Sequence, residues 1–439
     1  MGTRTVAPAL DLSKTQALRL LRRDPIRLIE RAAAVGDVVR IPVPRVRLTL
    51  ANHPDLAWDV LSTGARDFRK SPAIRNARRV LGRGLLTSEG ELHRRQRRLI
   101  QPIFHHDRID GYSAGIVEEA ERAADRLPVG ATVDVHEEMA RLTLTIVARA
   151  LFGSDLDDRD VVAVGAAMHE VLSQFDRQFS PWYRISSRLP LPSTRRFDRS
   201  VAVFDDVIRR MIARRRAEPG GEDLLSLLLA ADEDGAQMDD AQVRDEAVTL
   251  FLAGHETTSN ALTWTWWALS QDPEAERRLR AELDAELGGR APALADLPRL
   301  PFLRAVLQES IRLRPPAWLI GREAVTPHDL WDVPIAPGEV VLVSPWLLHH
   351  DERWWPDPEV FRPDRWLHED PDRPRHAYVP FGGGARMCIG EGFAELEALL
   401  VLATLARRHR FELDPGARVE LQPVITLRPR NGMPMRVAT

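Results

Sequence analysis

The sequence has a single cysteine, Cys388, among 439 residues. One thiol cannot form an intrachain disulfide or a metal site made of several cysteines. Three roles remain for it: a buried inert thiol, a nucleophile, or one soft ligand to a metal that something else already holds. A lone cysteine is also typical of a reducing compartment, so we expect the protein to be cytoplasmic.

Lysine and long apolar runs are scarce as well. Only Lys14 and Lys70 are lysines, and Lys+Arg 61 against Asp+Glu 64 gives a net charge of −3. A chain so balanced in charge is not a dedicated nucleic-acid binder. No stretch approaches the roughly 18 continuous apolar residues of a membrane span, so we expect no transmembrane anchor. Because no lysine follows the glycines at 382–384, these glycines do not form a Walker-type phosphate loop.

The pattern that is present is mostly helical. From about residue 89 to 314, apolar residues recur at helical spacing between breaks at proline and glycine clusters. From 315 to 380, twelve prolines and short β-branched runs such as residues 339–343 predict a meander with small strands. No repeat or low-complexity linker divides the chain. We therefore expect one mainly α domain over residues 1–439 with a minor β part.

The residues around Cys388 favour the ligand role. Glycines before it let the backbone turn sharply and approach a flat partner, and Gly390 opens a helix whose N-terminal dipole stabilises a thiolate. The pattern Phe-x-x-Gly-x-Arg-x-Cys-x-Gly, from Phe381 through Arg386 to Gly390, resembles the haem-binding signature of the cytochrome P450 superfamily at every fixed position. The alternative is a structural cysteine at a helix N-terminus.

The resemblance to bacterial, soluble members of this superfamily implies a fold and a cofactor. The fold would be mainly α, a helical prism that encloses haem, with small β-sheets. The cofactor would be haem b (heme b), with the Cys388 thiolate as axial ligand to the iron. Such a ligand donates electron density that favours O–O cleavage.

A second motif lies inside a helix that the pattern predicts over residues 241–270, ended by Asp272-Pro273. Here Gly254 and the paired threonines at 257 and 258 are poor choices for the middle of a helix. The segment is similar to the family's oxygen-binding helix, and the resemblance implies that Thr257 hydrogen-bonds the dioxygen being cleaved while Glu256 helps to relay protons. A helix crossed by a groove, or bent by serine and threonine, is the alternative.

Haem propionates need cationic or hydrogen-bonding partners, because buried carboxylates are costly unless paired. His93 and Arg97 are candidates, since they lie one helical turn apart. By resemblance Arg322 and Arg386 complete the set. For any one of these side chains, a solvated face is the alternative.

A third motif pairs Glu309 with Arg312, three residues apart on one expected helix face. On its own this would be a surface ion pair worth roughly 0 to 1 kcal/mol. The resemblance implies instead a buried network in which Arg365 joins the pair and locks the core around the cysteine loop. We expect these three residues to be structural.

The resemblance implies a monooxygenase, which inserts one oxygen atom of O2 into a C–H bond and uses two external electrons. The chain shows no flavin, nicotinamide or iron–sulfur domain, so we expect separate redox partners: a ferredoxin with its reductase, or a flavodoxin. Arg94, Arg95 and Arg98 could offer such an acidic partner a basic face, or simply aid solubility. A peroxygenase, a non-redox haem-thiolate enzyme and a haem gas sensor are the rival functions.

Hydrophobic side chains dominate the segments expected to line the substrate pocket, residues 74–86, 175–183, 251–252, 317–320 and 424–426. A greasy ligand held by shape is therefore expected. Residues 101–104 and the helix after 191–192 are reminiscent of bacterial sesquiterpene-oxidising members, so a terpenoid is preferred. Fatty acids, steroids and polyketides remain alternatives, and Arg75, Arg78 or Arg79 could hold a fatty-acid carboxylate.

Overall fold

The computed structural model describes residues 7–153, 163–165, 167, 170, 189, 191–218, 220–221, 223–233 and 236–439. The chain divides into two compact units, each assembled from stretches that are distant in sequence. Unit 1 comprises Met1–Pro72, Arg304–Cys388 and Glu420–Arg430, and unit 2 comprises Ala73–Leu303, Ile389–Val419 and Asn431–Thr439.

Unit 1 is built around a mixed five-stranded sheet. Its strands lie in the order β1 (Val38–Ile41), β2 (Leu48–Ala51), β10 (Val340–Val343), β7 (Ile320–Ala324) and β3 (Phe68–Lys70). Strands β2 and β10 run parallel, and the other neighbours are antiparallel. Two hairpins are formed by β8 (His328–Leu330) with β9 (Val333–Ile335) and by β12 (Leu421–Pro423) with β13 (Leu427–Pro429). The strands predicted within residues 315–380 are therefore present.

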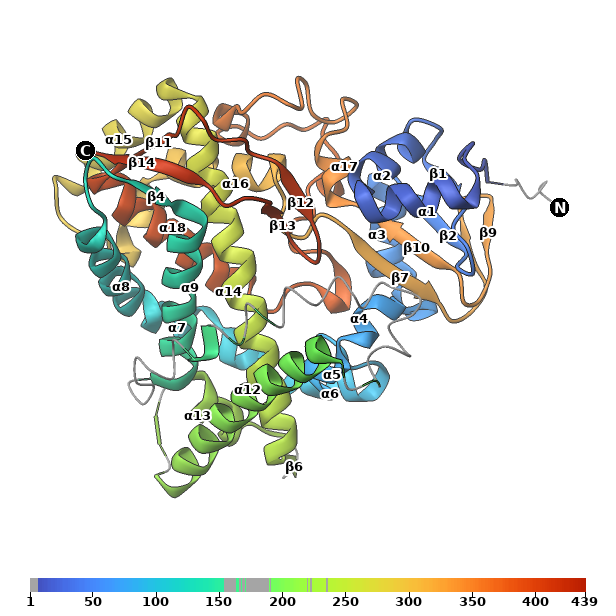
Figure 1. Cartoon of the computed structure of the whole chain (residues 1–439), viewed down its shortest axis with the longest axis horizontal. Helices are drawn as coiled ribbons and strands as arrows, with labels where there is room; N and C mark the ends of the chain where they lie inside the picture. Colours follow the sequence, from blue (N-terminus) through green and yellow to red (C-terminus); the bar gives the residue numbers. More distant parts are fainter. Residues whose placement is uncertain are drawn as a thin grey trace. The chain divides into compact units, whose positions relative to one another are not determined.

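Both faces of this sheet are buried, and the side chains of β10 show why. Val340 and Leu342 belong to one apolar core, which includes residues of α2 (Pro25–Ala33), whereas Val341 and Val343 belong to the other. This alternation follows from the two-residue period of a strand. The first core includes buried residues of α1 (Lys14–Arg23) and α2, two helices that appear in blue beside the sheet in Figure 1. The second core contains buried residues of α3 (Pro54–Trp58) and of the chain that follows it.

Two more helices complete unit 1. Helix α17 (Pro345–His349) follows β10 directly, and its N-terminus is capped by Ser344, whose hydroxyl accepts from the Leu347 amide at 3.3 Å. Helix α16 (Pro301–Leu313) belongs to unit 1 from Arg304 onward. These elements carry the buried network described below.

Unit 2 is mainly helical. Its helices are α5 (Arg78–Leu81), α6 (Gly90–Ile100), α7 (His106–Ile109), α8 (Ser113–Arg126), α9 (Val135–Phe152), α12 (Pro192–Ala217), α13 (Leu224–Ala230), α14 (Asp240–Gln271), α15 (Pro273–Leu287) and α18 (Glu391–Arg408), with α4 (Pro72–Asn76) at its start. A small sheet has the order β11 (Arg410–Leu413), β14 (Pro434–Ala438) and β4 (Thr132–Asp134), and β5 (Asp232–Glu233) pairs with β6 (Ala236–Gln237). Together with unit 1, this confirms the mainly α prediction.

Helix α14 is the central element of unit 2. It is buried on most of its sides, as expected for a helix inside a core, and it packs against α9, α12 and α18 (Figure 1). Asp239 caps its first turn by accepting from the Gln242 amide at 2.7 Å. It ends at Gln271, where Asp272 and Pro273 start α15. The helix predicted over residues 241–270 is therefore correct to within one residue at each end.

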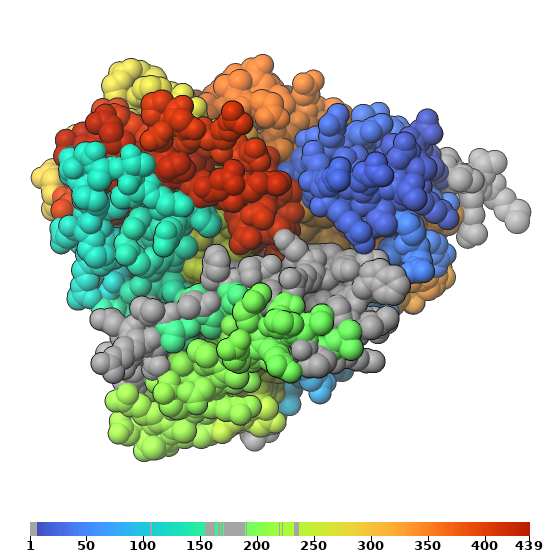
Figure 2. Space-filling model, in the orientation of Figure 1, coloured from blue at the N-terminus to red at the C-terminus, as the bar shows by residue number. Residues whose placement is uncertain are grey.

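Helix α12 contrasts with α14 because it lies at the surface. Figure 2 shows the green surface of α12 and α13 on the face in view. Its buried residues are confined to one stripe that includes Phe204, Val207 and Ile208, and arginines fill its last turn. None of the helices that the structure describes combines the length and the apolar composition of a membrane span.

Candidate active site

The cysteine loop, residues 381–388, is closed on itself by backbone hydrogen bonds in unit 1. The Cys388 amide donates to the Phe381 carbonyl at 3.0 Å, and the Met387 amide donates to the Gly384 carbonyl at 3.0 Å. Gly382 and Gly384 have φ angles of +73° and +64°, which only glycine adopts without strain. The loop presents Cys388 as an exposed thiol. In chain order Gly390 follows as the N-cap residue of α18.

The glycines also let the loop lie directly on its neighbours. A Cβ atom on Gly384 would clash with the carbonyl oxygen of Leu61, and one on Gly383 would lie 3.2 Å from the indole of Trp58. Any larger residue would push the loop off the stretch that carries Trp58 and Leu61. The sharp turns predicted from the glycine run are therefore present in unit 1, and the glycines also allow a close approach to Trp58 and Leu61.

Arg386 is tied to the same stretch. Its guanidinium donates to the carbonyl oxygens of Ala65 and Phe68 at 3.3 and 3.0 Å. Arg322 is buried on β7, directly opposite Lys70 of β3. Directly opposite residues of an antiparallel pair share a face of the sheet. Two buried cations thus face the same way.

Lys70 was missed in the sequence analysis. Its burial comes from strand pairing with β7, which no local pattern of residues 68–70 indicates. The signal that could have found it is the rarity of lysine, since only Lys14 and Lys70 occur in the chain.

The predicted network around Glu309 is confirmed as a buried one. Arg312 donates to both Glu309 oxygens at 2.9 and 2.8 Å, and both side chains are fully buried. Arg365 donates from Nε at 3.0 Å and Trp366 from Nε1 at 2.8 Å. The Arg362 amide adds a bond at 2.9 Å. Because all these donors bond to the Glu309 carboxylate, it can be buried in its ionised form.

The network reaches the start of the cysteine loop through His349. Arg312 donates to the His349 carbonyl at 2.7 Å, and the Val379 amide donates to the His349 Nε2 atom at 3.0 Å. Accepting that bond requires a neutral imidazole. Burial, helped by the nearby Arg312 charge, lowers the pKa of His349 well below its usual value. The ring is therefore kept neutral, as its hydrogen bond demands.

In unit 2, α14 carries the second motif without a break in its helix. Most of the helix is buried, yet Ala253 is exposed and Gly254 and Thr257 are partly exposed. These positions share one face, so the helix offers a short accessible strip in its middle. The Thr257 hydroxyl donates to the Ala253 carbonyl at 2.7 Å, and Glu256 is buried.

Gly254 has a packing reason of its own. A Cβ atom there would lie 3.0 Å from the Val147 side chain of α9. Next to it, His255 is buried, and its carbonyl accepts from the Thr143 hydroxyl at 3.1 Å. Burial lowers the pKa of His255 to about 4. The alternative of a helix crossed closely by another therefore accounts for Gly254, but not for the accessible Thr257.

A buried carboxyl beside this motif was also missed. Glu397 of α18 is fully buried next to the Thr258 hydroxyl. Burial raises the pKa of Glu397 well above its usual value, and Thr258 offsets this only in part. Glu397 is therefore held as a neutral acid in the core. Its apolar surroundings in α18 are visible in the sequence, but its lack of exposure is not.

Helix α6 places His93 and Arg97 one turn apart, with His93 buried and Arg97 partly buried. Arg94 and Arg98 lie on the exposed side, and Arg94 pairs with Glu91. The spacing thus puts the two predicted haem partners on the inner side of the helix.

The predicted site residues are divided between the two units. Those in unit 1 are Arg322, Phe381, Arg386 and Cys388, and those in unit 2 are His93, Arg97, Glu256, Thr257 and Gly390.

Two of the predicted pocket walls meet within unit 1. The Trp318 indole donates to the Val424 carbonyl at 3.0 Å, and Leu319 and Ile425 remain partly exposed. In unit 2, Phe251 contacts the rings of Phe152 and Phe204 and packs in the core. The predicted wall at residues 175–183 lies outside the described residues.

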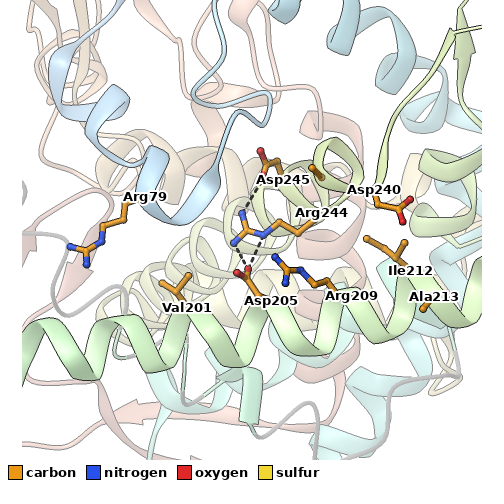
Figure 3. Close-up of a pocket in the computed structure, with 10 residues that line it drawn as sticks. Arg79, Val201, Asp205, Arg209, Ile212, Ala213, Asp240, Arg244 and Asp245 are labelled. Atoms are coloured by element: carbon orange, nitrogen blue, oxygen red, sulfur yellow. Dashed lines mark hydrogen bonds and ion pairs between the residues drawn. The ribbon is translucent and has the colours of Figure 1, made fainter.

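Unit 2 also has a surface cavity of about 580 Å³ between α5, α12 and α14 (Figure 3). Arg244 lies at its centre and donates to Asp205 and Asp245 at 2.8 Å. Arg79 pairs with Asp198 at 2.6 Å, and Arg209 contributes another cation. With charged groups compensating one another, this cavity does not match the apolar pocket expected for the substrate.

The donor set fits a haem iron better than a bare metal ion. Among the described residues, no group of three or more histidine, cysteine or acidic side chains could hold a metal by itself. A single exposed thiol on a tightly turned glycine loop suits a metal whose other ligands come from a flat macrocycle.

Comparisons with known proteins agree with this reading of the loop. The sequence model of the family described as Cytochrome P450 matches residues 21–433. Cyclooctatin synthase of Streptomyces melanosporofaciens is 39% identical over 96% of this chain and 93% of its own length. Cyclooctat-9-en-7-ol 5-monooxygenase of the same organism is 37% identical over 90% and 87%. Pentalenene oxygenase of Streptomyces avermitilis is 35% identical over 92% and 90%.

The fold gives the same answer. The crystal structure of CYP175A1 from Thermus thermophilus superposes with a TM-score of 0.77 at 29% identity, covering 98% of this chain and 100% of that one. The fold and the family predicted from the Cys388 pattern are thereby confirmed. The family implies a haem cofactor with a thiolate-ligated iron, a hydrophobic substrate, O2 and redox partners. With a family match across nearly its whole length, this chain belongs to the cytochrome P450 family.

Proposed function

We propose that the chain is a haem-thiolate monooxygenase that oxidises a terpenoid. In this reaction one oxygen atom of O2 enters a C–H bond, and the other leaves as water with two electrons and two protons. The observation that carries the chemistry is the exposed Cys388 thiol at the end of a loop closed by the Phe381 carbonyl. The names of the three relatives, which refer to cyclooctatin, cyclooctat-9-en-7-ol and pentalenene, support a terpenoid substrate.

The cofactor proposed is haem b, whose iron when bound supplies the activation of dioxygen. Cys388 would hold this iron through its thiolate. Arg322, Arg386, His93 and Arg97 would hold the propionates, and the buried Lys70 opposite Arg322 joins this set. In the chain, Phe381 precedes the thiol at the start of the loop, and Gly390 follows the thiol.

Thr257 and Glu256 would manage protons on α14. The Thr257 hydroxyl can donate a hydrogen bond from the accessible strip, while it now donates to the Ala253 carbonyl. Glu256 is one residue away and buried, which suits a group that passes protons on rather than binding substrate.

The electrons would come from a ferredoxin and its reductase, or from a flavodoxin, in the cytoplasm. The exposed Arg94 and Arg98 side of α6 could meet an acidic redox protein. We further propose that residues 1–439 act as a single functional domain, because the family match runs from residue 21 to 433 without interruption.

Substitution of Cys388 tests the iron ligand directly. In the wild-type protein we expect the reduced carbon-monoxide complex to show the red-shifted Soret band of thiolate ligation. Cys388→His should abolish this band while retaining some haem, because imidazole replaces the thiolate. An unchanged band in the variant would remove the central claim, since another residue would then be the ligand.

Substrate class is tested by ligand-induced spin shifts. Cyclic terpene hydrocarbons such as pentalenene, and cyclic terpene alcohols such as cyclooctat-9-en-7-ol, should displace water from the ferric iron. This displacement moves the iron from low to high spin. Long-chain fatty acids serve as the rival panel. Arg78 and Arg79 are already engaged, with the Thr87 carbonyl and with Asp198, which argues against a free carboxylate anchor there. Tighter spin shifts from fatty acids, lost in Arg75→Ala or Arg78→Ala, would overturn the terpenoid proposal.

A further inference from the structure

The cysteine loop of unit 1 rests on one short stretch of chain, residues 58–68, which we call the support segment. Trp58 and Leu61 lie under Gly383 and Gly384. The carbonyl oxygens at residues 65 and 68 accept both bonds from Arg386. The position of the loop therefore depends on the position of this segment.

The support segment is not a regular element. A π-helical turn (Asp59–Thr63) and a 3-10 turn (Ala65–Asp67) follow one another around Gly64. Runs of this kind hold their backbone less firmly than an α-helix. A segment with such weak internal bonding needs an outside contact to fix its shape.

His328 at the start of β8 supplies that contact. Its Nε2 atom lies 2.8 Å from Asp59 Oδ2, and its Nδ1 atom lies 2.9 Å from Asp67 Oδ2. One ring thus joins the two ends of the double turn. Both ring nitrogens donate only when the imidazole is protonated, so the geometry is that of an imidazolium between two carboxylates.

The surroundings reinforce this bridge. Thr63 donates to the other Asp59 oxygen at 2.8 Å, and Thr326 donates to the other Asp67 oxygen at 2.6 Å. The His328 side chain is only 12% exposed and meets the Phe68 ring edge-on at 4.9 Å. The ring also packs on Gly64, where a Cβ atom would collide with it.

We propose that His328, through Asp59 and Asp67, clamps the support segment and so positions Cys388 to bind haem iron. His328 is a positioning residue, since it acts through residues 58–68 and not on the thiol itself. This inference rests on the proposed function, because it assigns Cys388 to iron.

The charge of the clamp makes it sensitive to pH. Burial alone would lower the pKa of His328, but its hydrogen bonds to Asp59 and Asp67 outweigh burial and raise it above 6.5. These two aspartates are the charged groups that face the ring; β9, which pairs with β8, places Ile335 opposite His328. A histidine with a raised pKa contributes fully below its usual pKa, and its contribution is lost as pH rises through the folded value. The clamp should therefore open on the alkaline side.

A titration of the wild-type holoenzyme tests the clamp without any substitution. With isotope-labelled histidine, nuclear magnetic resonance should show the His328 ring still protonated at a pH above the usual histidine pKa of 6.5. The same spectra should show both ring nitrogens carrying protons. A His328 ring that titrates at or below the usual histidine pKa of 6.5 would overturn the proposal.

Variants then connect the clamp to the loop. In His328→Gln, amide hydrogen exchange of residues 58–68 and 381–388 should become roughly tenfold faster at about pH 6, as loss of one charge-assisted interaction would allow. Thr326→Val, which removes only the bond to Asp67, should show a smaller increase. His368→Gln is the matched control and should leave exchange in both stretches unchanged. Unchanged exchange in His328→Gln would contradict the clamp.

The thiolate signal separates failure of this inference from failure of the proposed function. In the wild-type protein, the share of the reduced carbon-monoxide complex with the red-shifted band should fall as pH is raised from about 6 to about 9, and in His328→Gln it should be low throughout. A wild-type protein that never shows the band would refute the thiolate ligand itself. A band equal in wild type and His328→Gln at every pH would refute only the clamp.

Discussion

Four threonine hydroxyls in the second half of α14 have different surroundings, and this decides which of them can act. Those of Thr263 and Thr265 donate to carbonyls four residues back and are buried. Thr258 is buried beside Glu397. Thr257 makes the same backbone bond as the first two, but its side chain is partly exposed. A hydroxyl of this kind can exchange its backbone bond for a bond to a ligand.

We therefore expect Thr257→Ala to fold and bind haem but to lose the yield of product per electron consumed. Without the hydroxyl, protons reach oxygen at the wrong position, and electrons are diverted to hydrogen peroxide or water. A marked fall in the ratio of product to reductant would match the loss of one proton-handling group. Thr257→Ser keeps the hydroxyl and is the control. Full coupling in Thr257→Ala would show that another group, or the substrate, delivers the protons.

Single residues could be predicted from the sequence where a local pattern marks them. Cys388 and Arg386 stand at fixed positions of a glycine-rich signature, and Thr257 is a residue type that is unfavourable in the middle of a helix. Lys70 and His328 could not be found in this way. Their role depends on which strands pair and on which charges lie nearby, and tertiary packing alone decides both.

At the scale of elements, the carboxylate of Glu309 joins α16 to residues 362–366. It is an acceptor for three side chains and a backbone amide, and it is fully buried with Arg312. Arg312 also stacks over the Trp355 ring at 5.2 Å. The spacing of Glu309 and Arg312 was visible in the sequence, but only the structure shows Trp366 as a donor.

Removal of one partner from this network should cost about 3 to 5 kcal/mol of unfolding free energy, because the other charge is left buried and unpaired. We expect Arg312→Ala to give little folded, haem-loaded protein and Glu309→Gln to lower the denaturation midpoint in urea. The exposed pair of Glu274 and Arg277 provides the control. Glu274→Gln should change stability by no more than about 0.5 kcal/mol. Equal changes in unfolding free energy at Glu309 and Glu274 would mean that the buried network contributes no more to stability than an exposed ion pair.

At the scale of the whole molecule, each unit gathers stretches that are far apart in the chain. The central sheet of unit 1 pairs β2 with β10 across almost 300 residues, as the register of Leu48 with Val340 shows. Helix positions and the proline-rich meander follow from local periodicity, so the sequence predicts them well. Strand partners and the burial of charged groups depend on these distant pairings, and periodicity carries no information about them.

Long-range packing also buries histidines in both units. Burial lowers the pKa of His255 in unit 2 to about 4 and of His350 in unit 1 to about 3, and it also lowers the pKa of His349 well below its usual 6.5. A histidine held neutral in the fold binds its proton only after unfolding. Its contribution to stability is therefore present above pH 6.5 and is lost as pH falls below this value toward the folded pKa.

We thus expect the holoenzyme to lose stability between about pH 7 and about pH 5, a range in which most exposed carboxylates remain ionised. Each of these histidines should steepen the loss by up to about 1.4 kcal/mol per pH unit. Urea unfolding at a series of pH values measures the slope. In His255→Gln the slope should be shallower than in the wild-type protein by about one histidine's share. A stability that stays flat over this range would show that water or structural relaxation reaches these rings, and that they are not held neutral by packing.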